Sequence, residues 1–251
     1  MGERRQVESA WDMIRDFAEL AIPESCPGCG SPGKLCLQCQ QELRTVPQQI
    51  TPRVAVAAPT WACGPYGGVR QALVLAAKEH RDVIARETIG SVIGASLAHL
   101  IAHGQLAHPA VQPLLLVPAP TRRSASRRRG GDPITQVCEY AASYLKRSGG
   151  TLHGGRRTDK NDQIFVSPVL RTREEAKDSA GLSARTRRQN LSGKIVPEVK
   201  ELSRSAGENA GRSQIVLVDD VITTGATVAE SVLVLASMGI RTSLVLSFTQ
   251  A

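Results

Sequence analysis

The amino-acid sequence predicts an α/β fold, with a parallel sheet flanked by helices and a small cysteine-rich module before it. Two short apolar runs, 114–117 and 215–218, indicate strands buried on both faces, and each is followed by a loop and a helical pattern. A third apolar run, 243–248, follows the second helix. Such alternation is typical of parallel strands joined by helical crossovers. With 251 residues, 41% of them apolar, the chain is long enough to bury a core, which excludes a disordered tail or a cysteine-stapled miniprotein.

The N-terminal residues 1–22 predict an amphipathic helix. Trp11, Phe17 and Leu20 recur among acidic and basic residues at helical spacing, unlike the continuous apolar stretch of a signal peptide. No segment is apolar for long enough to span a bilayer. We therefore expect a cytoplasmic protein without a membrane span, in a compartment where thiols stay reduced.

Residues 46–68 predict a linker, because they are rich in proline and show no regular period. The helical pattern that follows extends from 71 to 102 and breaks near 80–82. These boundaries predict that the sheet-containing domain covers residues 69–251.

The second half of this domain alternates helices with polar segments. Asp132 and Pro133 are typical of a helix start, so we expect a helix over 133–146. Residues 148–213 are polar, with short apolar pieces, and are expected to include a mobile loop. A further helix, ending at Met238, precedes the last strand.

A run of acidic, small and hydroxylated residues follows the strand 215–218. Its members are Asp219, Asp220, Thr223, Thr224, Gly225, Ala226 and Thr227. Ligands bind at the carboxyl ends of parallel strands, and hydroxyl and N–H groups at a helix N-terminus suit a phosphate. Two carboxylates would repel phosphate but suit sugar hydroxyls or a divalent cation. The run therefore predicts a sugar-phosphate site, the alternative being an ordinary helix cap.

The loop after the strand 114–117 is strongly basic. It begins with Pro118, Ala119, Pro120 and Thr121, and five arginines follow within 122–129 with no acid among them. Guanidinium groups suit phosphate, and this loop leaves the same sheet edge as the acidic run. We expect it to bind a second anion there. The alternatives are a solvated basic loop or a nucleic-acid patch.

The acidic run resembles the loop of type I phosphoribosyltransferases that binds 5-phosphoribosyl 1-pyrophosphate (PRPP). The resemblance implies a type I phosphoribosyltransferase-like sheet, in which Asp219 and Asp220 act in catalysis by contacting the ribose 2′ and 3′ hydroxyls. It also implies that residues 223–227 hold the 5′-phosphate, that the loop after the strand 114–117 receives the pyrophosphate, and that Mg²⁺ binds with PRPP.

The order of several other stretches resembles the ComF family, whose members are phosphoribosyltransferase-like proteins, some linked to natural transformation. Residues 117–120 and 127–132 are similar to its VPVP and RxRGFN stretches, with Gly131-Asp132 in place of Phe-Asn. Residues 67–70 with Lys78, and the segment 170–191, match two further stretches, so the resemblance covers about residues 23–250.

Several site residues follow from this resemblance alone. It implies pyrophosphate contacts from Lys78, Ala119, Pro120, Thr121, Arg122 and Arg129. It also implies a flexible lid over residues 153–193, with Arg171, Arg187 and Asn190 covering the site. Nothing in the sequence indicates the acceptor substrate or the oligomeric state.

Four of the six cysteines lie in the predicted module 23–45. Cys26, Cys29, Cys36 and Cys39 form two Cys-x-x-Cys knuckles with six residues between them. Four thiolates complete a tetrahedron around Zn²⁺ and leave no open position, which predicts a structural zinc site. An iron–sulfur cluster or redox thiols are the alternatives. ComF proteins commonly carry such a module. Cys63 and Cys138 have no partners in the pattern, and Cys138 is expected to be a small core residue.

The net charge of +8 is concentrated in two segments. Residues 122–129 carry five basic residues, and 153–190 carry nine basic against five acidic ones, so the rest of the chain nets −1. This distribution favours a protein that binds PRPP or a nucleotide phosphate. The alternative is a competence factor that handles single-stranded DNA or joins the competence machinery, although aromatic residues, at 3%, are too few for a base-stacking platform.

The double substitution Asp219→Asn with Asp220→Asn distinguishes these two functions, because it should abolish PRPP binding and spare DNA binding.

Overall fold

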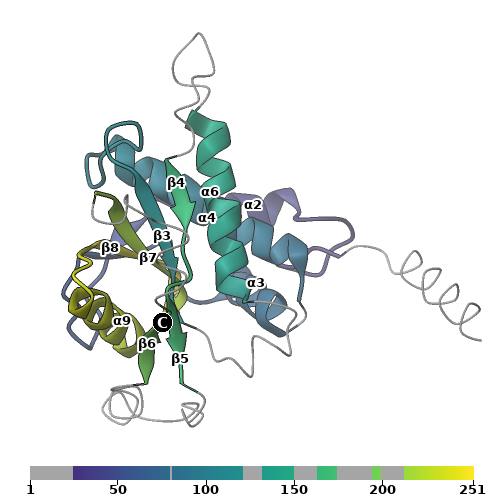
Figure 1. Cartoon of the computed structure of the whole chain (residues 1–251). Coiled ribbons are helices and arrows are strands. Elements are labelled where there is room, and N and C mark those ends of the chain that lie inside the picture. Colours follow the sequence, from purple (N-terminus) through teal and green to yellow (C-terminus); the bar gives the residue numbers. More distant parts are fainter. Residues whose placement is uncertain (1–24, 80, 121–131, 150–162, 174–193, 199–211) are drawn as a thin grey trace, which may run out of the picture.

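The computed structural model describes residues 25–79, 81–120, 132–149, 163–173, 194–198 and 212–251. It confirms the α/β class: helices flank a six-stranded, mostly parallel sheet, and the cysteine module precedes it (Figure 1). The strand order is β1-β2-β8-β7-β3-β4, and every neighbouring pair is parallel except β1 with β2. The strands are β1 (Gln48–Gln49), β2 (Thr60–Ala62), β3 (Leu114–Pro118), β4 (Ile164–Val166), β7 (Gln214–Ile222) and β8 (Thr242–Gln250).

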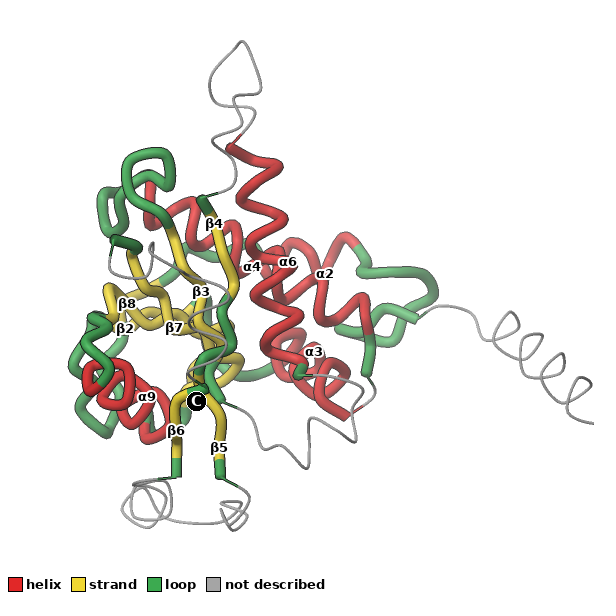
Figure 2. Tube along the Cα trace, in the orientation of Figure 1, coloured by secondary structure: helices red, strands yellow, loops and turns green. Residues whose placement is uncertain are grey.

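Helices cover both faces of this sheet (Figure 2). On one face lie α3 (Gly68–Glu79), α4 (Val83–Ala102) and α6 (Pro133–Gly149), with the short α2 (Leu37–Leu43) packed beside α3. On the other face lies α9 (Ala226–Ser237). A separate antiparallel ribbon of β5 (Leu170–Thr172) and β6 (Ile195–Pro197) packs on the α9 side.

The central strands divide their side chains between two cores. Leu114 and Leu116 of β3 pack with α3, α4 and α6, whereas Leu115 and Val117 pack with α9. All five residues of β3 are buried. This burial on both faces explains why the strand appears in the sequence as an unbroken apolar run.

The expected break in the first helical segment is confirmed. It separates α3 from α4, and the Asp82 side chain accepts a hydrogen bond from Ala85 N at 2.9 Å as the N-cap of α4. Arg81 has a positive φ of 55°, which turns the chain sharply between the two helices. The turn therefore fixes where α3 ends.

The segment expected to be a linker contributes two strands to the sheet. β2 pairs in parallel with β8, with Thr60 opposite Val245, and β1 extends the edge. At two and three residues, both strands are too short to show a period in the sequence. β7 also runs four residues further than expected, because β8 pairs with it as far as Ile222. The predicted helix 1–22 and most of the predicted lid 153–193 lie outside the described residues.

Candidate functional site

The carboxyl ends of β3 and β7 lie side by side. The two strands are parallel, with Val117 opposite Leu217 and Pro118 opposite Val218. Ala119 N then donates to Val218 O at 2.8 Å, so Ala119 lies beside the start of the acidic run. This is the sheet edge at which ligands of open parallel sheets bind.

Asp219 and Asp220 form part of β7 itself rather than a loop after it. Asp219 pairs with Ser247 of β8, and its Oδ1 accepts a hydrogen bond from Asp220 N at 2.9 Å. Both residues are partly exposed, whereas the five residues before them in β7 are buried. β7 therefore carries two carboxylates at the edge of the sheet, directly after its buried part.

Lys78, near the C-terminus of α3, forms an ion pair with Asp220. Its Nζ lies 2.9 Å from Oδ1 and 2.8 Å from Oδ2 of Asp220, and the two side chains are 33% and 18% exposed. The buried face of α3, which includes Leu73 and Ala77, holds this helix against the core. The fold thus brings a lysine and an acid, separated by 142 positions in sequence, into direct contact.

The environment raises the pKa of Asp219 to about 7. Burial is the largest cause, and the negative charges of Asp220 and Asp132 add to it. The Lys78 ammonium and the N–H of Asp220 act in the opposite direction. A carboxyl group with such a pKa can change its protonation state near neutral pH.

The threonine–glycine loop connects β7 to α9. Gly225 is the N-cap residue with a positive φ of 84°, and no side chain caps the helix there. Thr224 is buried and its Oγ1 accepts from Ala226 N at 3.3 Å, whereas Thr223 is exposed and Thr227 partly so. The N-terminus of α9 therefore faces the sheet edge with a positive dipole end and small side chains.

Residues of the segment between β1 and β2 pack over this loop. Val54 N donates to Thr224 O at 2.8 Å, and the buried Val54 side chain packs with Ala226. A Cβ on Gly225 would lie 2.5 Å from Cβ of Pro52. Glycine is therefore required here both by backbone conformation and by the close approach of residues 52–54.

The remaining residues expected at the sugar-phosphate site fall into three groups. Ala119 is buried and Pro120 is partly exposed at the end of β3. Arg171 lies on β5, where its Nε is 2.8 Å from Oε2 of Glu198, so the structure pairs it within the ribbon. Thr121, Arg122, Arg129, Arg187 and Asn190 lie outside the described residues.

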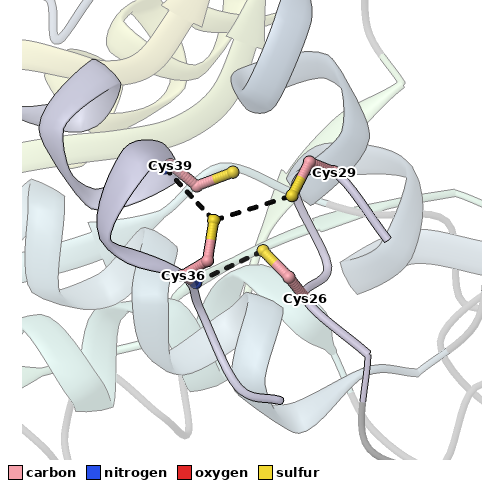
Figure 3. Close-up of side chains that lie close together, drawn as sticks. All are labelled: Cys26, Cys29, Cys36 and Cys39. Atoms are coloured by element: carbon pink, nitrogen blue, oxygen red, sulfur yellow. Dashed lines mark hydrogen bonds between the residues drawn. The ribbon is translucent and has the colours of Figure 1, made fainter. Parts of the chain in front are cut away.

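The four cysteines of the N-terminal module converge on one point (Figure 3). Their Sγ atoms all lie within 4.8 Å of one another, and those of Cys29 and Cys36 are 3.6 Å apart. Sulfurs on a zinc tetrahedron with bonds of about 2.3 Å would be about 3.8 Å apart. The donor set and its spacing therefore suit a metal ion and are consistent with zinc.

The surroundings of these thiols also shift the pKa values of two of them. Burial raises the pKa of Cys26, but backbone hydrogen bonds from Cys36, Cys29 and Gly28 outweigh it and lower the pKa to about 6. Burial and the neighbouring thiols raise the pKa of Cys39. Since metals bind thiolates, an ion would displace the proton that Cys39 otherwise retains.

The sequence analysis assigned no role to two arginines that the structure buries, Arg70 and Arg86. Arg70 donates to the carbonyls of Leu43 and Cys63 at 3.3 Å, which ties the end of α2 to the residues after β2. Arg86 contacts α3 and α6 from α4. A signal was present for Arg70, which falls on the apolar stripe of α3 at a position that the period assigns to the core. α4 has apolar residues on all sides, so its pattern gives no such signal for Arg86.

A groove of about 770 Å³ lies between the cysteine module and α4. Its lining is mostly apolar, with Leu43, Val46 and Val92 among the contributors and Lys34 and Arg44 as basic members. None of the residues expected to bind the sugar phosphate lines it. The groove is therefore distinct from the sheet edge.

The chain matches no protein-family model and no curated protein. Among the described residues, no helix has the combination of length and apolarity needed to cross a bilayer.

Proposed function

We propose that this protein is a ComF-type, phosphoribosyltransferase-like protein that binds PRPP, or a related ribose phosphate, together with magnesium. The site catalyses phosphoribosyl transfer with release of pyrophosphate, or derives from a site that did, and the acceptor is unassigned. The observation that carries the proposal is the cluster of Asp219, Asp220 and Lys78 directly before the glycine-capped N-terminus of α9.

Each part of this cluster suits one part of PRPP. The carboxylates of Asp219 and Asp220 can accept hydrogen bonds from the ribose 2′ and 3′ hydroxyls. Residues 223–227 offer hydroxyl and N–H groups at a helix N-terminus, which suit the 5′-phosphate. Lys78, which contacts Asp220, and the Ala119–Pro120 backbone, which follows β3 at the same sheet edge, offer a cation and polar groups that suit pyrophosphate.

The proposed transfer breaks the bond between ribose C1 and a pyrophosphate oxygen, which leaves with the electron pair. A lone pair on the acceptor forms the new bond at C1, and an acceptor that carries a proton on that atom releases it to solvent or to the departing pyrophosphate. Positive charge develops on the ribose in the transition state, and the nearby carboxylates of Asp219 and Asp220 would stabilise it. Lys78 would neutralise part of the charge on the leaving group, and magnesium bound together with PRPP would neutralise more of it; we assign no described residue as a magnesium ligand.

The cysteine cluster has a structural role in this proposal. Four sulfur ligands complete the coordination of Zn²⁺, so no position is left for substrate. Gly28 packs so closely that a Cβ would lie 2.8 Å from Sγ of Cys39 and 2.9 Å from Val69 of α3. A zinc ion would thus hold the module against the helix that also carries Lys78.

Calorimetric titration with magnesium-PRPP tests the proposal. Asp219→Asn with Asp220→Asn should weaken binding by about 100-fold or more, because two hydrogen bonds to charged acceptors become bonds to neutral amide oxygens. Glu139→Gln, on the exposed face of α6, is the matched control and should bind like the wild type. A screen of bases and amines for pyrophosphate release would then identify the acceptor.

Absence of PRPP binding by the wild type would contradict the proposal. Binding of single-stranded DNA that falls steeply with salt and survives the double substitution would favour the competence factor instead. In that case the basic segments would contact nucleic-acid phosphates.

A further inference from the structure

Arg86 joins three helices through one buried guanidinium group. The residue lies on α4 and is 4% exposed. Its Nε and Nη2 donate to Ala77 O of α3 at 3.2 and 3.1 Å, and its Nη1 donates to Gln136 Oε1 of α6 at 2.7 Å. A buried charged group needs such partners, so these contacts constrain all three helices.

The contact with Ala77 lies next to the proposed PRPP site. Ala77 directly precedes Lys78, whose Nζ contacts both carboxylate oxygens of Asp220. Gln136 lies in the first turn of α6, which begins soon after the basic residues 122–129. Arg86 therefore connects the lysine of the site to the helix that follows its predicted pyrophosphate loop.

The last turn of a helix leaves carbonyl groups without partners inside the helix, and such ends fray. In α3, Asp82 N donates to Ala76 O at 3.2 Å, and Arg86 supplies two N–H groups to Ala77 O. The guanidinium charge also interacts favourably with the negative end of the helix dipole. The planar guanidinium group donates two hydrogen bonds to Ala77 O and one to Gln136. A lysine ammonium at the same place cannot make all three.

We propose that Arg86 is a positioning residue for the PRPP site, which holds the end of α3 against α6 so that Lys78 meets Asp220. The consequence for ligand binding rests on the proposed function. The contact between Lys78 and Asp220 does not, and it is measurable without a ligand. The two claims can therefore fail separately.

The first experiment measures the acetylation rate of Lys78 by mass spectrometry in the ligand-free protein. An ammonium held by a carboxylate reacts slowly, so Asp220→Asn should speed the reaction about fivefold. Arg86→Lys should give a similar increase and Gln136→Ala about a twofold one. Lys34, exposed in the cysteine module, is the internal control and should react at one rate in all variants.

Wild-type rates at Lys78 in both Arg86→Lys and Gln136→Ala would overturn the proposal. Should Arg86→Lys fail to fold, Gln136→Ala decides, because Gln136 is partly exposed and its truncation leaves the core intact. Circular dichroism of each variant shows which case holds.

The second experiment is a double-mutant cycle in the magnesium-PRPP titration. Arg86→Lys should weaken binding about fivefold in the wild type and leave it unchanged in Lys78→Met, because Arg86 acts through Lys78. Arg70→Lys is the matched control, since Arg70 is also buried but contacts Leu43 O and Cys63 O instead. Its effect should be the same in both backgrounds.

An equal loss from Arg86→Lys in both backgrounds would mean that Arg86 has only a structural role, and would overturn the proposal. Absence of PRPP binding by the wild type would contradict the proposed function. The acetylation rates would still test whether Arg86 positions Lys78.

Discussion

The ammonium group of Lys78 lies 2.8 Å from Oδ2 and 2.9 Å from Oδ1 of Asp220. This contact joins the C-terminal end of α3 to the carboxyl end of β7. It also places a positive charge near Asp219, whose pKa burial and Asp220 raise to about 7. One lysine therefore pairs with Asp220 and also lowers the pKa of Asp219.

Lys78→Met should raise the pKa of Asp219 further, because Lys78 is one of two groups that lower it. We expect an increase of about tenfold in the proton affinity of this carboxyl group. Carbon-13 NMR of the aspartate side chains, followed from pH 5 to 9, measures it. Lys34→Met is the control and should leave the titration of Asp219 unchanged. An unchanged titration in Lys78→Met would show that the ion pair does not reach Asp219.

Asp219→Asn should make the protein more stable at pH 8. The pKa of Asp219 is raised in the folded state, from an ordinary 3.8 to about 7, so the folded state binds more protons between these values. Stability must then fall as pH rises through this window. We expect the neutral amide of the variant to remove this loss and to add about 1–2 kcal/mol at pH 8, after allowance for partial exposure of the site.

Urea unfolding at pH 4 and pH 8 measures this difference. The gain should disappear at pH 4, where Asp219 is protonated in the folded state. Glu139→Gln, on an exposed part of α6, should show no such pH-dependent gain. A destabilised Asp219→Asn at pH 8 would indicate that the charged carboxylate stabilises the fold.

The sequence predicted those parts of the fold whose signals are local. The runs 114–117 and 215–218 are apolar because β3 and β7 are buried on both faces, and Asp82 caps α4 within one turn. β2 was missed because three residues carry no period, and its place depends on pairing with β8. Long-range pairing of this kind leaves no local trace.

In the candidate site, too, the sequence predicted the local features and missed the contacts between distant residues. The cysteine spacing predicted the cluster, and the apolar run before Asp219 predicted that the acidic pair lies at the carboxyl end of a buried strand. The ion pair between Lys78 and Asp220 was not predicted, because nothing local relates residues so far apart. Packing of Pro52 and Val54 over Gly225 likewise depends on a contact between distant segments.

Cys39→Ser should remove the metal from the module and destabilise the protein. Cys39 is 1% exposed and its sulfur lies among the other three, so its loss opens the tetrahedron. We expect one zinc per chain in the wild type, much less in the variant, and a loss of about 3 kcal/mol or more in the free energy of unfolding. Metal analysis and urea unfolding measure the two quantities.

Cys138→Ala is the control for this experiment. Cys138 is also fully buried but lies on α6, outside the cluster. It should keep its zinc and lose only about 1 kcal/mol, as expected for a small buried side chain. Equal zinc content in the Cys39 and Cys138 variants would exclude the four-cysteine site.

Gly225→Ala should destabilise the protein more than Gly239→Ala does. Both glycines have a positive φ, 84° and 76°, so each substitution costs about 1 kcal/mol of backbone strain. A Cβ at Gly239 meets nothing within 4 Å, whereas one at Gly225 would lie 2.5 Å from Cβ of Pro52. The difference in unfolding free energy between the two variants therefore measures the close packing over the loop, and we expect about 1–3 kcal/mol. In the proposed function this loop holds the 5′-phosphate, so Gly225→Ala, which must shift the loop away from Pro52, should also lose magnesium-PRPP binding, whereas Gly239→Ala should retain it. Equal losses in stability would show that the segment around Pro52 moves aside at no cost in free energy and does not hold the loop in place.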